Sequence, residues 1–257
     1  MKLFKSIAFA AMAVAISAGA AAAKDWSKIR IGTEGAYPPV NYFDSNNELQ
    51  GFDVDIAKAL CAEMKVECEF VAQDWDGIIP ALLANKYDAI IASMSITEER
   101  MKQVDFTAKY YSTPPALIAP KDTALTETSP EALAGKTIGA QSATTHATFL
   151  EDVYKGSTIK LYGTQDEANL DLASGRLDAV AADSVVLGEW LKTADGGCCK
   201  MVGAMKNDPK YFGEGAGIAV RKEDGDLKEM INKALAAILA NGTYKAINDK
   251  YFDFSVY

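Results

Sequence analysis

Residues 87–100, YDAIIASMSITEER, contain the transition that predicts the fold. The first five residues form a short apolar run of the kind that becomes a buried strand, and short polar residues follow it at once. Ser95 or Thr97 can cap a helix that begins there, and the spacing of Ser95 and Glu98 matches a capping box. The stretch therefore predicts a buried strand whose carboxyl end leads into a helix, with Arg100 in the first turn of that helix.

The same alternation of β-like and amphipathic helical runs extends in both directions along the chain. We predict strands at residues 28–34, 68–73, 87–93, 137–141, 158–163 and 177–183. We predict helices at residues 51–64, 75–85, 97–104, 144–156, 164–175, 184–193 and 226–242. This alternation indicates βα units and a mostly parallel sheet, which places the chain in the α/β class.

The two halves of the chain echo each other. Lys86-Tyr87-Asp88-Ala89 and Arg176-Leu177-Asp178-Ala179 each follow an amphipathic helix and open an apolar strand. We interpret this as two similar α/β lobes.

The C-terminal segment does not simply extend the second lobe. Its helix ends at Asn241-Gly242 and has one apolar face, formed by Leu227, Ile231, Ala234, Leu235, Ile238 and Leu239. Residues 243–254 are too few to form a core alone, so we expect the first lobe to bury both pieces. The chain then crosses between the lobes twice, near residues 111–114 and 206–210, and two crossings make a hinge. The expected division is residues 24–111 and 210–257 for lobe 1 and residues 114–206 for lobe 2.

Residues 1–23 have the pattern of a secretory signal peptide: two early lysines, an uncharged apolar run and an alanine-rich end. A membrane-anchoring helix is the alternative, which the short apolar core disfavours. Cleavage anywhere from Ala20 to Lys24 fits the pattern equally well. No later stretch is apolar and uncharged over the ~18 residues that a membrane span needs. We therefore expect a soluble protein outside the cytoplasm.

The charge of the chain limits its partners. Asp and Glu outnumber Lys and Arg by 35 to 26, for a formal net charge of −9. Nucleic acids and anionic lipids both need a basic footprint, so neither is the expected partner.

Four cysteines are present: Cys61, Cys68 and the adjacent Cys198 and Cys199. An oxidising compartment favours a Cys61–Cys68 bridge across a short helix-to-strand turn. Metal binding is the alternative, but the chain has one histidine and no CxxC motif. For Cys198 and Cys199 a strained vicinal disulfide, free thiols and intermolecular pairing all remain open.

Three predicted loops suit a small zwitterionic ligand: residues 92–97, residues 141–145 and the loop that begins at Asp183. Ligands of open α/β sheets bind beyond the carboxyl ends of the strands, where helix N-termini favour anions. A guanidinium such as that of Arg100 can grip a carboxylate with two hydrogen bonds, although it could instead pair with a surface acid. Thr144 and Thr145 would offer backbone N–H groups to the same anion, and Asp183 could accept hydrogen bonds from an ammonium. Together these groups describe a site for an α-amino acid.

Flat apolar side chains could complete this site. Tyr37 and Trp75 could hold the stem of the ligand, or could equally belong to the core.

An enzymatic function is disfavoured. His146 is the only histidine, and no GxSxG motif accompanies it. The glycines form neither a GxGxxG nor a Walker loop, so no nucleotide cofactor is expected.

Several motifs in fixed order, covering nearly the whole chain after residue 23, carry a family resemblance. They are RIGTEGAYPPV (30–40), GFDVDIAKALC (51–61), the run from Trp75 to Arg100, VDFTAKYY (104–111), EANLDLASGRLDAVAAD (167–183), KYFGEGAGIAVRKED (210–224) and NGTYKAINDKYFDFSVY (241–257). They closely resemble the periplasmic binding proteins of polar amino acid ABC transporters, in particular the lysine/arginine/ornithine- and histidine-binding branch.

The resemblance implies a two-lobed, type II periplasmic binding protein fold, with a mixed sheet flanked by helices in each lobe and two hinge crossings. It implies closure around one amino acid and its delivery to a membrane permease, and we expect the protein to be a monomer. Arg100, with Ser93, Ser95, Thr144 and Thr145, would hold the carboxylate, and Asp183 the α-ammonium. Tyr37 and Trp75 would sandwich the side chain, and the Cys61 and Cys68 pair matches the disulfide of the family.

Departures from the branch bear on which amino acid is bound. Ala92 replaces a serine, Glu34 replaces an aspartate that meets the distal cation of the ligand, and Gln141 and His146 replace Leu and Gln. We expect a receptor for a cationic L-amino acid, arginine or ornithine first and lysine or histidine next. Because Glu34, Trp75 and Ala92 also resemble opine-binding relatives, a receptor for opines or neutral polar amino acids is the second hypothesis. An exported enzyme on the same fold is the third.

Overall fold

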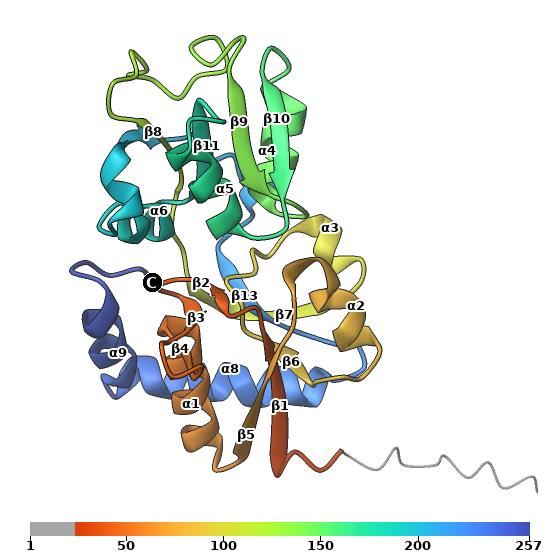
Figure 1. Cartoon of the computed structure of the whole chain (residues 1–257). Coiled ribbons are helices and arrows are strands. Elements are labelled where there is room, and N and C mark those ends of the chain that lie inside the picture. Colours follow the sequence, from red (N-terminus) through yellow and green to blue (C-terminus); the bar gives the residue numbers. More distant parts are fainter. Residues whose placement is uncertain (1–23) are drawn as a thin grey trace, which may run out of the picture.

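The computed structural model describes residues 24–257, which form two lobes (Figure 1). Each lobe is built on its own five-stranded sheet, with strand orders β5-β1-β6-β13-β7 and β10-β9-β11-β8-β12. A small three-stranded sheet, β2-β3-β4, accompanies the first. The predicted signal peptide, residues 1–23, lies outside the described residues.

Both sheets are mixed, as the family resemblance implies. In the first, β1 (Lys28–Thr33), β5 (Glu67–Ala72) and β6 (Ala89–Ile90) are parallel, whereas β13 (Ala216–Val220) runs antiparallel to its neighbours β6 and β7 (Asp105–Tyr111). In the second, β9 (Thr137–Gln141), β10 (Thr158–Tyr162) and β11 (Ala179–Asp183) are parallel, and β8 (Pro115–Pro120) and β12 (Cys199–Ala204) complete it in antiparallel pairings. The strands of the small sheet are β2 (Ala36–Tyr37), β3 (Asn41–Phe43) and β4 (Leu49–Gln50).

The C-terminal helices belong to the first lobe, as their apolar pattern predicts. Helix α8 (Gly225–Ala240) buries five of its six predicted face residues in the same core as Ile29 and Ile31, with Leu239 packed at the edge. Helices α1 (Phe52–Met64) and α9 (Thr243–Tyr251) pack beside it, and α8 runs along one side of the first lobe (Figure 1). Gly242 takes a left-handed φ of 86° directly after α8, so the predicted stop is confirmed.

The sequence echo between the halves corresponds to equivalent hydrogen bonds. The Asp88 N–H donates to Arg30 O (2.8 Å) and the Asp88 carboxylate accepts from Arg30 N–H (2.9 Å). Asp178 makes the same pair of contacts with Thr137, at 2.9 and 2.8 Å. In each lobe an aspartate thus fixes the entry of the central parallel strand against its neighbour.

The remaining helices connect the strands, and some are shorter than predicted. They are α2 (Ile78–Leu83), α3 (Glu98–Met101), α4 (Thr145–Val153), α5 (Gln165–Ala173), α6 (Ser184–Trp190) and α7 (Pro209–Phe212), with 3-10 turns η1 (Trp75–Gly77) and η2 (Asp195–Cys198). Helix α3 was predicted to run to residue 104, but it stops at Met101 because β7 starts at Asp105. The first turn of the helix predicted at 75–85 is a 3-10 turn.

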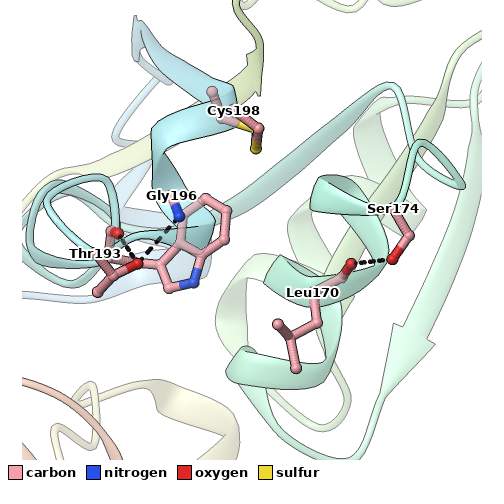
Figure 2. The surroundings of a disulfide bond; sticks show 7 residues. Leu170, Ser174, Thr193, Gly196 and Cys198 are labelled. Carbon is pink, nitrogen blue, oxygen red and sulfur yellow. Dashed lines mark hydrogen bonds between the residues drawn. A yellow bond between two sulfur atoms is a disulfide. The ribbon is translucent and has the colours of Figure 1, made fainter.

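The structure pairs all four cysteines, as Cys61–Cys68 and Cys198–Cys199. Cys198 ends η2, next to the turn in which Gly196 N–H donates to Thr193 Oγ1 (3.0 Å), and α5 residues Leu170 and Ser174 lie on the other side (Figure 2). Cys199 pairs with Pro120 at the end of β8, whereas Pro115 at the other end pairs with Asp183. The vicinal pair therefore lies at the opposite end of β8 from Asp183.

Among the helices of residues 24–257, none combines the length and apolar character that a membrane span requires. Within the same residues, no group of three or more His, Cys, Asp or Glu side chains is arranged to hold a metal ion.

Candidate functional site

A cavity lies between the lobes, and all twelve predicted ligand-binding residues line it. The lining residues are Glu34, Tyr37, Trp75, Ala92, Ser93, Ser95, Arg100, Gln141, Thr144, Thr145, His146 and Asp183. Seven come from the first lobe and five from the second, so the cavity exists only while the lobes are together.

Arg100 occupies one wall of the cavity. Thr97 is the N-cap of α3 and accepts a hydrogen bond from Arg100 N–H (3.3 Å), so Arg100 lies in the first turn as predicted. Ser95 is not the cap, because it forms an isolated bridge with Ala216, and the predicted capping box is absent from α3. The Arg100 guanidinium donates to Ser95 O (3.0 Å), which fixes its direction.

Within the described residues, the Arg100 guanidinium contacts an aromatic ring and backbone oxygens and forms no ion pair with a carboxylate. Its carbon lies 5.2 Å from the centre of the Trp75 ring, a cation–π arrangement. Within residues 24–257 no carboxylate forms an ion pair with it, so the surface ion pair considered as an alternative is not formed there. Burial lowers the pKa of Arg100 to about 10, and the Asp183 carboxylate opposes that shift. The group is therefore cationic at neutral pH and can accept an anion.

The N-terminus of α4 faces the same cavity from the second lobe. Thr144 is its N-cap, accepting from Ala147 N–H (3.1 Å) while its hydroxyl donates to Gln141 O (2.7 Å). The first N–H groups of a helix have no intrahelical partner, and the helix dipole favours an anion there. Thr145 and His146 provide two such N–H groups at the cavity.

Asp183 lies at the end of β11, where it is the first residue before α6. Its carboxylate accepts from Tyr37 OH (2.8 Å) and from Thr113 Oγ1 (3.0 Å). Asp183 and Arg100 line one cavity without pairing with each other. The cavity thus offers a carboxylate and a guanidinium as separate groups.

Glu34 provides a second carboxylate, directly after β1. It accepts from Gln141 Nε2 (2.5 Å), a contact between the lobes. The pKa of Glu34 is raised to about 7, chiefly by burial and to a smaller extent by the carboxylates of Asp74 and Asp76, while the hydrogen bond from Gln141 opposes the shift. A cation beside Glu34 would relieve this cost, since an opposite charge favours the ionised form.

Two loop residues at the cavity have a left-handed backbone. Ser93, which follows β6, and Ala143, which follows β9, both have φ of 54°. Such conformations are costly for residues other than glycine and tend to occur at functional sites. Ala143 O accepts from Trp75 Nε1 (3.2 Å) and from the Arg100 guanidinium (3.4 Å), so this backbone turn joins both lobes.

The imidazole of His146 packs on Phe212, with ring centres 5.3 Å apart. It is 7% exposed, and burial lowers its pKa, so it is neutral at pH 7.

Contacts across the cleft describe a closed arrangement. The hydrogen bonds to Ala143, Glu34 and Asp183 described above connect the two lobes. Outside the cavity, the Ser142 hydroxyl also donates to Asp76 Oδ1 (2.8 Å). Ser142, Asp76, Ala143 and Thr113 were not among the predicted residues. Their role depends on which surfaces meet after closure, and the local sequence carries no signal for that.

Residues 29–254 match the family described as bacterial extracellular solute-binding proteins, family 3. This chain belongs to that family.

Several amino-acid-binding proteins match this chain along nearly their full length. The L-arginine-binding protein of Pseudomonas aeruginosa is 49% identical over 232 residues, 89% of this chain and 89% of that protein. The histidine-binding periplasmic protein of Escherichia coli K12 is 43% identical over 244 residues, 94% of each chain. A solved ancestral arginine-binding protein bound to arginine superposes with a TM-score of 0.82 at 41% identity, covering 88% of this chain and 98% of its own. The predicted two-lobed fold and the predicted family are confirmed.

Proposed function

We propose that this protein is an extracytoplasmic receptor for a cationic L-amino acid, arginine or ornithine first and lysine or histidine next. The observation that carries the proposal is the placement of Arg100 and Asp183 as separate, unpaired charges on one inter-lobe cavity, with the buried carboxylate of Glu34 in the same space. An L-amino acid with a cationic side chain carries a carboxylate, an α-ammonium and a side-chain cation. These complement Arg100, Asp183 and Glu34, respectively. The names of the relatives agree with this ligand class.

Each lining group then has a role. The ligand carboxylate lies against Arg100, the N-terminus of α4 and the hydroxyls of Ser93 and Ser95. The ligand ammonium donates to Asp183. The aliphatic stem packs between Tyr37 and Trp75, whose side chain is 8% exposed.

The distal cation of the ligand meets Glu34, which Gln141 orients. Ala92 leaves room where a serine would add a hydroxyl, and His146 lies at the carboxylate end, on the first turn of α4.

Binding and transport follow from lobe closure. We propose that lobe 1 comprises residues 24–111 and 210–257 and lobe 2 residues 114–206, and that the two connecting segments act as the hinge. Ligand stabilises the closed form because only there do both lobes touch it. In this proposal the chain is exported after removal of residues 1–23, acts as a monomer, and presents its closed form to the permease of an ABC importer.

Isothermal titration with the twenty amino acids, ornithine, citrulline and octopine tests the proposal. We expect heat of binding from arginine and ornithine first. Flat traces for every cationic ligand would refute the proposed specificity.

Two variants extend this test to the head group of the ligand. Arg100→Ala and Asp183→Ala should each weaken arginine binding by roughly 100-fold or more, because each leaves a buried ligand charge without its partner. The temperature of unfolding without ligand should stay close to that of the wild type. If both variants unfold at a lower temperature than the wild type but keep its affinity for arginine, Arg100 and Asp183 have a purely structural role.

A neutral polar ligand is the second candidate, and Glu34 is the observation that favours it. With a pKa of about 7, a protonated Glu34 needs no cation beside it. Replacing Glu34 with Gln should weaken a cationic ligand strongly and a neutral one hardly at all.

We also propose that the protein acts as a receptor and not as an enzyme, because the relatives reported above are binding proteins. Turnover that Asp183→Ala or a His146 variant abolishes would contradict this.

A further inference from the structure

A buried carboxylate lies behind the cavity, outside the ligand site itself. Asp53 is in the first turn of α1 and is 1% exposed, and it does not line the cavity. It belongs to the GFDVDI motif, to which the proposed function gives no role. A buried carboxylate needs compensating hydrogen bonds, and the partners of this one are informative.

One hydrogen-bond chain joins Asp53 to the loop that follows β6. Tyr110 OH donates to Asp53 Oδ1 (2.6 Å) and accepts from Ser93 N–H (3.2 Å). The side chain of Ser93 also bonds to Tyr111 OH. Ser93 has the left-handed φ of 54°, so these contacts hold it in a conformation that it would otherwise disfavour.

A second chain joins Asp53 to the loop that follows β1. Asn41 Nδ2 donates to Asp53 Oδ2 (3.0 Å), and Asn41 Oδ1 accepts from Gly35 N–H (2.9 Å). Gly35 lies between Glu34 and Ala36, two residues before Tyr37. Asn41 and Tyr110, the middle links of the two chains, are both 0% exposed, so water cannot substitute for either of them.

Every bond in both chains points toward Asp53 as the final acceptor. Its two oxygens therefore anchor the two lobe 1 loops that carry Glu34, Tyr37, Ala92, Ser93 and Ser95. Removing the acceptor would leave buried donors in both chains unpaired.

We propose that Asp53 is a positioning residue for the ligand site: its carboxylate holds the 34–37 and 92–95 segments at one point and thereby fixes the lobe 1 half of the site. This rests on the proposed function for its ligand readout. The pKa of Asp53 is raised to about 7, chiefly by burial, while the hydrogen bonds from Tyr110 and Asn41 act in the opposite direction because they favour the ionised, accepting form.

The test compares Asp53→Asn with a matched control, Asp88→Asn. Asp88 is also a buried aspartate of lobe 1, but it accepts from Arg30 and Arg221, away from the cavity. Isothermal titration with L-arginine should show affinity at least about tenfold weaker in Asp53→Asn, because the asparagine amide has only one acceptor oxygen and cannot accept from both Tyr110 and Asn41. Asp88→Asn should lose stability and keep its affinity to within about twofold, since distant sites act independently.

Amide hydrogen exchange measured by NMR without ligand gives a second readout. In Asp53→Asn at least one of the Gly35 and Ser93 amides should exchange at least about tenfold faster than in the wild type, because one of the two chains loses its acceptor. In Asp88→Asn both rates should be unchanged. Tyr110→Phe keeps the ring packing, removes one link, and should accelerate Ser93 but not Gly35; it also serves if Asp53→Asn does not fold.

The proposal is overturned if the Gly35 and Ser93 amides keep their wild-type rates in Asp53→Asn or, should that variant not fold, if Ser93 keeps its rate in Tyr110→Phe. Equal loss of affinity in Asp53→Asn and Asp88→Asn would overturn it too, because overall stability would then control binding. If wild-type protein binds no cationic amino acid, the proposed function fails, and the exchange rates still decide the role of Asp53.

Discussion

Glu34 is the residue on which ligand choice depends most. In the closed arrangement its pKa is raised to about 7, chiefly by burial, whereas the open cleft would return it toward its ordinary value near 4.5. Because the pKa of Glu34 is higher in the closed form, Glu34 favours closure at pH values below its open-state pKa. This advantage is lost as the pH rises through about 7. A cationic ligand removes the effect, because its charge compensates the ionised Glu34.

We therefore predict different pH behaviour for arginine and its neutral analogue citrulline. Above pH 5, arginine affinity should be less sensitive to pH, while citrulline affinity should fall by at most roughly tenfold per pH unit up to about pH 7. The ratio of the two affinities cancels the pH dependence of groups that affect both ligands alike, including Asp53, which lies behind the cavity. Titrations from pH 5 to 8 measure this ratio; Glu34→Gln should flatten it, and a constant ratio in the wild type would contradict the role of Glu34.

At the scale of elements, the N-terminus of α4 makes a specific contribution to binding. Thr144 caps α4 at the cavity, and Thr164 caps α5 away from it, with a capping box to Glu167. Both threonines cap a helix, but only Thr144 lines the cavity. Comparing variants of the two therefore distinguishes an effect on helix stability from an effect on ligand binding.

Thr144→Ala and Thr164→Ala should each lower the free energy of unfolding by about 1 kcal/mol, the usual cost of losing a cap. Only Thr144→Ala should also weaken arginine binding, because only α4 presents its N–H groups to the ligand. Denaturant unfolding and titration give the two quantities. Equal affinities of the two variants would remove α4 from the proposed site.

The sequence predicted the elements that carry the site better than it predicted those that complete the sheets. The predicted loops after β6, β9 and β11 follow parallel strands, and apolar runs that end in polar residues identify them. Besides the three strands of the small sheet, the strands β7, β8, β12 and β13 of the two large sheets were not among those predicted. β8 begins and ends with proline, which reads as loop, and each makes antiparallel pairings that depend on the return path of the chain.

The choice between Ser95 and Thr97 as the cap of α3 shows the same limit. Both residue types suit the position equally. Ser95 is excluded from it by a bridge to Ala216, more than a hundred residues away in the chain. Local patterns therefore identified loops that meet at one cavity, while long-range pairing set the details.

At the scale of the whole molecule, contacts between the lobes outside the cavity should help to hold the closed form. The Ser142 hydroxyl donates to Asp76 across the cleft, whereas the Ser157 hydroxyl donates to Leu133 O within the second lobe (2.7 Å). The second bond does not depend on closure, so it is a suitable control.

Ser142→Ala should weaken arginine affinity by about two- to fivefold, mainly through faster dissociation, because it removes one exposed bond from the closed state. Ser157→Ala should leave the dissociation rate unchanged. Stopped-flow displacement of bound arginine measures both rates. Unaltered dissociation from Ser142→Ala would mean that this contact does not contribute to closure.

A crystal structure of the complex with L-arginine tests the central claim most directly. We expect the α-carboxylate within hydrogen-bond distance of Arg100 and the first N–H groups of α4, the ammonium on Asp183 and the guanidinium beside Glu34. Arginine bound in the reverse direction, or outside the cavity between the lobes, would contradict the account.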